Sequence, residues 1–325
     1  MLLMRIKSIY LLCIFCLPFI RLSGQERYFR PGFTQAVMIN PALSGAGGKG
    51  TLRMSYINVL PVISRGLQSA VLSYDFYSDF LHGGIGFFAA NDFDGEIINN
   101  TGGGFSYAYH LKAGRDLYIN AGLGSFIRHT GINRNRIILP DQIDPLSGNI
   151  LPTGDIISYA GRTYFDLNTG FFINYKNYSG AVSVNHLAKP DSEGGGTAEG
   201  HLKRRLTLFA WSDYFIDRSK KYKVSPLIFF DISGEDYMVS GNAVLASGQV
   251  AVNAGTSLNS AGDINMRGGI SFRIINTFLF YNYCFNLKSY NNMLPLTISH
   301  EGGISVSLNN VNKRNTVRTI IFPEL

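Results

Sequence analysis

The sequence is poor in charged residues, in cysteine and in tryptophan. Only 16% of its 325 residues are charged, and it holds three cysteines and one tryptophan. Cys13 and Cys16 lie within the first 24 residues, so Cys284 is the one cysteine in the remainder of the chain. A single thiol excludes a disulfide bond within that remainder.

After residue 24 the sequence also lacks any apolar run of 18 residues, which excludes a membrane-spanning helix there. Residues 1–24 begin with the basic Arg5 and Lys7, continue with an apolar stretch and end in small residues. This layout predicts a signal peptide that is removed, and hence export. A single membrane anchor is the alternative, but the stretch is short for spanning and Pro18 interrupts it.

Neither sign of charge dominates the exported part of the chain. Removal of the leader takes away three basic residues and no acidic one, which lowers the formal net charge from +7 to +4. So small an excess of positive charge does not indicate a nucleic-acid partner.

The residues that usually carry catalysis or bind metals are scattered. No pair among the six histidines has the helical i, i+4 spacing or the cysteine partners that a zinc site needs. The stretch NDFDGE, Asn91 to Glu96, lacks the distal glutamate of a calcium-binding loop, so we interpret it as an ordinary loop. Without a nucleophile elbow or a phosphate-binding glycine loop, the sequence predicts no catalytic residue, cofactor or metal, and hence no enzyme.

The sequence is rich in aromatic residues and glycine, and its apolar residues recur at every second position. In GFSYAYHLK, Gly104 to Lys112, large apolar residues alternate with small or polar ones, which is the period of a β-strand. The same pattern predicts fourteen strands near residues 50–57, 67–76, 83–91, 103–112, 117–129, 164–175, 178–187, 204–215, 222–231, 237–246, 249–257, 265–274, 277–287 and 298–308.

A soluble β-sandwich also alternates, but two further features favour a membrane barrel. The second face of the strands is mostly small and uncharged, as suits a confined lumen. Long connections, at 130–163 and 188–203, alternate with short ones such as Lys176-Asn177, Ser247-Gly248 and Ile275-Asn276. Long loops on one rim and tight turns on the other are typical of outer-membrane barrels. We therefore predict an all-β fold, a transmembrane antiparallel up-and-down β-barrel of about 14 strands over residues 50–308.

Tyrosines near the strand ends are candidates for the aromatic girdles that mark the edges of a bilayer. They are Tyr109, Tyr164, Tyr175, Tyr178 and Tyr222.

Alternation in the last predicted strand places Glu301 inside the barrel and His300 outside it. A carboxylate in a narrow lumen needs a partner, and Arg273 and Arg53 are the candidates. A structural ion pair is the simpler interpretation, and a functional carboxylate is the alternative.

Two segments flank the predicted barrel. Residues 25–49 include FTQAVMINPALSG, which is apolar and breaks at Asn40-Pro41. An apolar segment free in the periplasm is a liability, so we hypothesise that it folds into or beneath the barrel mouth as a plug. Residues 309–325 form a periplasmic tail, which is either a disordered end or a docking peptide for a partner. In the tail, the candidate docking residues are Lys313, Arg314, Arg318 and Phe322.

Several of these stretches, taken in order, resemble the PorP/SprF-like outer-membrane proteins of the Bacteroidetes type IX secretion and gliding system. FTQAVMINPALSG is similar to that family's entry motif, which falls here on Asn40, Pro41, Ala42 and Gly45. YSGAVSVNHLAKPDSE, with His186, is similar to a mid-barrel strand, and SHEGGISVSL, with His300 and Glu301, to a late one. The chain departs from the family in lacking its tryptophan-containing stretch after the first strand and its Cys-Pro-aromatic end.

The resemblance implies a non-enzymatic outer-membrane protein that works with the secretion and gliding machinery. Its implied partners are periplasmic lipoproteins, a peptidoglycan-binding OmpA-like protein, the C-terminal domain of a secreted adhesin, and outer-membrane lipid. An outer-membrane channel for hydrophobic or small solutes is the alternative. A soluble β-rich binding module is a third.

Overall fold

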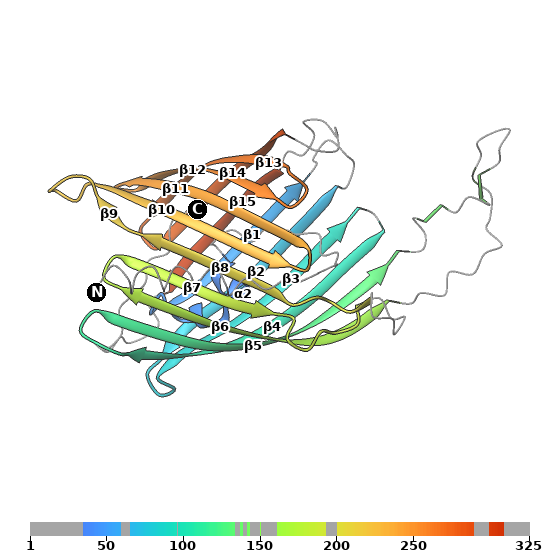
Figure 1. Cartoon of the computed structure of the whole chain (residues 1–325), viewed down its shortest axis with the longest axis horizontal. Helices are drawn as coiled ribbons and strands as arrows, with labels where there is room; N and C mark the ends of the chain where they lie inside the picture. The colour runs from blue at the N-terminus through green and yellow to red at the C-terminus, as the bar shows by residue number, and fades with distance from the viewer. Residues whose placement is uncertain are drawn as a thin grey trace, which may run out of the picture.

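The computed structural model describes residues 35–59, 66–95, 97–133, 137–138, 142–143, 150, 161–192, 200–288 and 299–308. Within these residues, the strands form a single antiparallel sheet that closes on itself (Figure 1). Closure comes from the pairing of the first strand with the last, Gly50 opposite Leu308, so the wall has no free edge to expose to lipid.

The chain enters the described part through two short helices, α2 (Ala36–Ile39) and η2 (Pro41–Leu43). The strands that follow are β1 (Gly50–Val59), β2 (Leu67–Ser78), β3 (Gly83–Asp94), β4 (Ile98–Lys112), β5 (Leu117–Ile132), β6 (Arg162–Tyr175), β7 (Tyr178–Asn185), β8 (Arg205–Ser212), β9 (Tyr214–Phe215), β10 (Tyr222–Ser233), β11 (Asp236–Ser247), β12 (Val250–Asn259), β13 (Ile264–Ile274), β14 (Thr277–Lys288) and β15 (Ser299–Leu308).

These fifteen elements make a wall of fourteen strands, because β8 and β9 are two parts of one strand. Both pair with β10, and only Asp213 separates them. The predicted closed barrel of 14 antiparallel strands is therefore confirmed. The boundaries differ most at β4, which begins at Ile98 rather than at residue 103.

Alternation along each strand sorts the side chains between lipid and lumen. In β6, Phe165, Phe171 and Ile173 are exposed, whereas Asp166 and Phe172 are buried inside the barrel. The exposed side chains form the outer surface that lipid would cover.

Three turns of two residues each join neighbouring strands on one rim of the barrel, which we call the short-turn rim. We call the opposite rim the long-loop rim. Lys176, Gly248 and Ile275 each begin such a turn with a positive φ, of 53°, 62° and 55°. A positive φ at this position is what a tight turn between right-twisted strands requires. The second of these turns comprises residues 248–249, one residue later than the sequence predicts.

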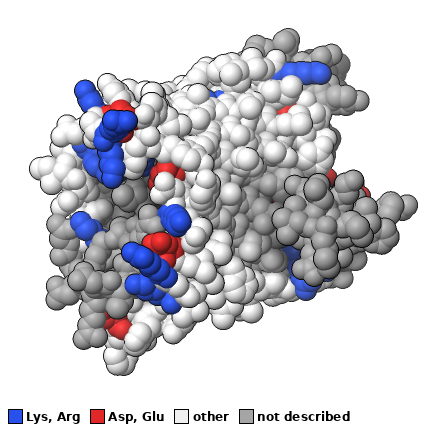
Figure 2. Space-filling view, turned by 60° about the vertical axis from the view of Figure 1, so that its left-hand side comes forward, with Lys and Arg blue, Asp and Glu red and all other residues white. Residues whose placement is uncertain are grey.

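The face of the barrel that Figure 2 shows has an almost uncharged middle band, and most of its lysine, arginine, aspartate and glutamate side chains lie towards the two ends. On the short-turn rim, four lysines lie over aromatic rings: Lys112 over Tyr118, Lys176 over Tyr175, Lys220 over Phe215 and Lys221 over Tyr222. Cationic heads beside amphipathic rings suit the headgroup level of a bilayer.

Four of the five candidate girdle tyrosines are exposed, but Tyr164 is 8% exposed and faces the lumen. Its assignment to a girdle is therefore wrong, because it lies one position from the outward-facing Phe165. Across the described residues, no helix is long and apolar enough to span a membrane.

The inside of the wall is apolar where it meets the two helices. Ile39 and Leu43 form one buried cluster with Phe172, Trp211 and Leu227 from the wall. On β10, Leu227 and Phe229 belong to or pack against this cluster while Ile228 is exposed on the outside, so this stretch of the wall is apolar on both faces.

Candidate functional site

Residues 35–46, which we call the inner segment, lie inside the barrel. Asn40, Ala42 and Ser44 are each 0% exposed. The wall residues that the segment contacts lie towards the short-turn rim, near the ends of β2, β4 and β6 and the beginnings of β3 and β5. This rim is the periplasmic one in the predicted topology.

Asn40 fixes the inner segment to two neighbouring wall strands. Its side-chain Nδ2 donates to the carbonyl oxygens of Phe171 on β6, at 3.3 Å, and Val182 on β7, at 3.0 Å. Its Oδ1 accepts from the backbone N–H of Ala42 at 2.9 Å and so caps η2, whose first residue is Pro41. Asparagine suits the cap and proline suits the first helical position, which gives the Asn-Pro pair a local physical reason.

The other end of the inner segment is tied to β2 and β4. His110 Nε2 lies 2.9 Å from the carbonyl oxygen of Ser44, and the Ser44 hydroxyl lies 2.7 Å from that of Ser106. The backbone N–H of Gly45 donates to Asp75 Oδ2 at 2.8 Å, and the other oxygen of Asp75 is paired with Arg53. Gly45 has a φ of +67°, which glycine adopts without strain.

Three wall glycines let the inner segment approach the sheet closely. A Cβ on Gly84 would lie 1.8 Å from the carbonyl oxygen of Ser44, and one on Gly122 would lie 2.3 Å from the backbone nitrogen of Ala42. A Cβ on Gly170 would lie 2.0 Å from Asn40 Oδ1. The absence of a side chain at these three positions therefore allows the inner segment to pack directly against the wall.

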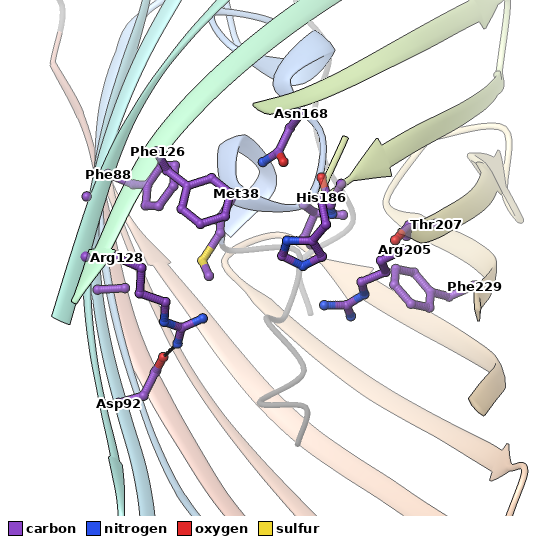
Figure 3. Close-up of a pocket in the computed structure, with 15 residues that line it drawn as sticks. Met38, Phe88, Asp92, Phe126, Arg128, Asn168, His186, Arg205, Thr207 and Phe229 are labelled. Atoms are coloured by element: carbon purple, nitrogen blue, oxygen red, sulfur yellow. Dashed lines mark hydrogen bonds and ion pairs between the residues drawn. The ribbon is translucent and has the colours of Figure 1, made fainter. Parts of the chain in front are cut away.

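A cavity of about 100 Å³ lies on the long-loop side of the inner segment (Figure 3). Met38 and Ile39 of the segment line it, together with the aromatic rings of Phe88, Phe126 and Phe229 from the wall. Such a lining offers an apolar contact surface to a ligand.

Charged pairs surround this apolar surface. Arg128 is paired with Asp92, and Arg205 Nε lies 2.9 Å from both carboxylate oxygens of Asp231. These pairs link β3 with β5 across β4, and β8 with its neighbour β10, without a net charge inside the wall.

His186, the residue of the mid-barrel motif, also lines the cavity. Its Nδ1 lies 2.5 Å from Asp166 Oδ2, and Asp166 is 0% exposed. The other Asp166 oxygen accepts from the backbone N–H of Ala188 at 3.3 Å and from that of Leu167 at 2.7 Å. The pair therefore fixes the point at which the chain leaves β7 for the long-loop rim.

The late-strand motif is divided between the two faces of the wall, as alternation predicts. His300 lies on the outside, where its Nδ1 is 2.6 Å from the hydroxyl of Tyr281. Glu301 is buried inside and is paired with Arg267. The predicted partners, Arg273 and Arg53, are wrong.

Strand register gives the reason. Glu301 is level with Asn282, and Asn282 is level with Gly269 on β13. Arg267 is two residues from Gly269 on the same face, whereas Arg273 is four residues away in the other direction, a distance of about 13 Å.

Apart from Glu301, sequence reasoning missed the inward charges, and it also missed the wall glycines. Asp92 falls in NDFDGE, which we interpreted as a loop, but Asn91 to Asp94 are the last residues of β3. The available signal was a charge or a glycine at an inward position of an alternating strand.

The leader, Phe33, and the tail residues Lys313, Arg314, Arg318 and Phe322 lie outside the described residues. Among the described residues, no cluster of three or more His, Cys, Asp or Glu side chains is placed to hold a metal ion.

Solved structures of similar fold are outer-membrane channels. The monoaromatic hydrocarbon channel CymD matches with a TM-score of 0.52 and 12% identity, over 88% of this chain and 96% of that one. A deletion mutant (deltaS2) of the monoaromatic hydrocarbon channel TodX matches with a TM-score of 0.50 and 13% identity, over 89% of this chain and 97% of that one. At such identity the likeness shows the barrel fold alone.

The chain matches none of the curated proteins with which it was compared. Residues 26–306 match the family described as "Type IX secretion system membrane protein PorP/SprF". That match spans nearly the whole part of the chain after the predicted leader, and it agrees with the closed barrel of the structure. The protein therefore belongs to the PorP/SprF family of type IX secretion system membrane proteins and is a β-barrel of the outer membrane.

Proposed function

We propose that the protein is a non-enzymatic anchor of the type IX secretion system, which joins periplasmic components of the machinery to a secreted adhesin at the cell surface. The observation that carries this proposal is the inner segment, which occupies the part of the lumen lined by β2–β7 and is hydrogen-bonded to β2, β4, β5, β6 and β7. A lumen filled in this way suits a scaffold better than a passage for solutes.

The two rims suit two sets of partners. The short-turn rim carries exposed basic side chains, Lys112, Arg115, Lys176, Lys220 and Lys221 among them, and faces the periplasm in the predicted topology. β15 ends at Leu308 on the same rim. We therefore assign periplasmic lipoproteins and the peptidoglycan-binding OmpA-like protein to this rim, and the C-terminal domain of the adhesin to the long-loop rim.

A channel for hydrophobic or small solutes is the second candidate function. The observation in its favour is the aromatic lining of the cavity beside Met38. A channel predicts uptake of an aromatic or aliphatic solute by vesicles that contain the protein, whereas an anchor predicts none.

The experiment that tests the proposal is affinity purification of the full chain from outer membrane in mild detergent. We expect periplasmic lipoproteins of the secretion machinery and a secreted adhesin to co-purify with the wild type. The matched control is a tagged, unrelated outer-membrane barrel from the same cells. Recovery of the chain without any component of the secretion machinery would contradict the anchor function.

A further inference from the structure

The half of the lumen formed by β11–β15 has a polar lining of its own, away from the inner segment. It surrounds a cavity of about 280 Å³ close to the long-loop rim. Its polar side chains include Asn242, Asn265, Arg267, Asn282, Asn286 and Glu301. The side chains that line the cavity form rows that run across neighbouring strands. Successive rows are about 7 Å apart because only every second residue of a strand faces inward.

The deepest row is a chain of hydrogen bonds that ends on Glu301. Asn253, Gly269, Asn282 and Glu301 lie level on β12 to β15. Asn253 Nδ2 donates to Asn282 Oδ1 at 2.9 Å, and Asn282 Nδ2 donates to Glu301 Oε2 at 3.3 Å. A Cβ on Gly269 would lie 1.9 Å from Asn282 Oδ1, so glycine is required for the two amides to meet across the wall.

Below this row, towards the periplasmic side, Phe280 lies on the same inward face of β14 as Asn282. Phe280 is 5% exposed, and a Cβ on Gly303 would lie 2.4 Å from its ring. The cavity therefore has amide walls, and Phe280 lies between it and the short-turn rim, so a ligand would enter from the long-loop rim.

One buried group in this cavity lacks a partner. Glu301 is 4% exposed, its Oε2 is held by Arg267 and Asn282, and its Oε1 makes no hydrogen bond within the described structure. A buried carboxylate oxygen without a donor is costly, and ordered water or a ligand is the usual remedy. The free oxygen therefore marks the place where a donor from a bound molecule is needed.

We propose that this cavity binds a neutral saccharide that enters from the long-loop rim. Arg267 neutralises Glu301, so the pair offers directed hydrogen bonds without a net charge for an ion. Side-chain amides and serine hydroxyls supply donors and acceptors side by side, which matches the hydroxyl groups of a sugar ring.

Other classes of ligand fit less well. The guanidinium of Arg267 beside Glu301 opposes a metal cation there, and Asp263, the other acidic residue of the lining, accepts a hydrogen bond from Asn259. Ile57 and Val59 are the large apolar residues in the lining, which leaves little surface for a lipid chain or for the side chains of a peptide. The volume, slightly below the lower limit of about 300 Å³ for drug-sized sites, suits one or two sugar units, so a trisaccharide would place one end in the cavity.

Cys284 provides a direct readout, because it lines the cavity and is the one cysteine after residue 24. The full mature chain would be purified in an amine-oxide detergent, which carries no sugar headgroup. The rate of maleimide labelling of Cys284 would then be measured with maltotriose, cellotriose or chitotriose, and with an uncharged Gly-Ser-Asn-Gly peptide amide. We expect at least one trisaccharide to slow labelling at least fivefold, with saturation, and the peptide to have no effect.

Two variants identify the site. Glu301→Gln should raise the half-saturating concentration of the active trisaccharide about tenfold or more, the loss carried by one hydrogen bond to a charged group. Asn242→Ala should also raise the half-saturating concentration, and it serves as the test variant if Glu301→Gln does not fold. Ser305→Ala, on the same face of β15 but on the other side of Phe280, is the matched control and should leave it unchanged.

The proposal is overturned if no trisaccharide slows the labelling. It is also overturned if the peptide amide slows labelling and the sugars do not, or if the slowing is non-saturable and the same in all variants.

Discussion

Asn40 joins the inner segment to the wall, so its replacement should weaken the whole barrel. Asn40→Ala removes the two bonds from Nδ2 to the carbonyl oxygens of Phe171 and Val182 and the cap on the N–H of Ala42. Because Ala42 is 0% exposed, its N–H would be left buried without a partner.

The magnitude follows from these three bonds. Loss of an asparagine cap costs about 1 kcal/mol, and each lost hydrogen bond costs about 0.5–1.5 kcal/mol. We expect Asn40→Ala to lower the free energy of unfolding by about 2–4 kcal/mol.

The single tryptophan of the chain is a built-in reporter for this experiment. Trp211 is 4% exposed, stacks on Phe172 with ring centroids 5.7 Å apart, and belongs to the cluster that contains Leu43. Urea unfolding of the protein in lipid vesicles, followed by Trp211 fluorescence, therefore measures the wall and the inner segment together. Asn276→Ala, at an exposed position in the turn between β13 and β14, is the matched control and should change the free energy by less than about 0.5 kcal/mol.

A double-mutant cycle makes the prediction specific. A Cβ on Gly170 would collide with the Asn40 side chain, so Gly170→Ala should break the same bonds and cost a similar amount by itself. In the Asn40→Ala background, Gly170→Ala should cost less than about 1 kcal/mol, because the collision is gone. Equal costs of Gly170→Ala in both backgrounds, or a wild-type midpoint for Asn40→Ala, would refute the reasoning.

Three further predictions concern the lipid face, the lumen and the tail. Leu123 is 67% exposed in the middle of β5, so Leu123→Arg should lower the free energy of unfolding in vesicles by about 2–4 kcal/mol. Ile216 is 66% exposed in a turn, so Ile216→Arg should leave the free energy of unfolding almost unchanged. Equal urea midpoints for the two variants would argue against the proposed lipid boundary. Arg128→Met leaves the buried carboxylate of Asp92 without its guanidinium partner and should lower the free energy of unfolding in urea by about 2–3 kcal/mol. The loss is smaller than for a fully buried pair because Arg128 is partly exposed. An unchanged urea midpoint would contradict this prediction. Truncation after Asn310 should leave heat-modifiability on gels unchanged but abolish co-purification of periplasmic partners; survival of co-purification would rule out the docking peptide.

The wall of the barrel is predictable from the sequence because its information is local. A period of two, tight turns and alternating loop lengths are each readable from a few neighbouring residues, and lipid outside enforces the alternation. The resemblance to the PorP/SprF family, carried by motifs spread along the chain, is likewise confirmed by the match over residues 26–306.

The inside of the barrel is much less predictable because it depends on register between strands far apart in sequence. Glu301 was correctly placed inside, but its partner is Arg267, since strand pairing and not sequence distance decides which side chains are level. In the same way, Gly170 appears as one more strand glycine until the structure places Asn40 against it. Interactions between a wall and the segment it encloses have no periodic signature in either of them.

The central claim is that the barrel is closed, with the inner segment filling the part of the lumen lined by β2–β7, and the proposal that rests on it is an anchor and not a pore. The most direct test is the electrical conductance of single purified barrels in a planar bilayer. The account predicts no steady conductance for the wild type, and channel openings for the double variant Gly84→Ala and Gly122→Ala, whose new Cβ atoms would collide with the backbone of Ser44 and Ala42 and displace the inner segment from the wall. A stable, open, ohmic channel in the wild type would contradict the account and favour a solute channel.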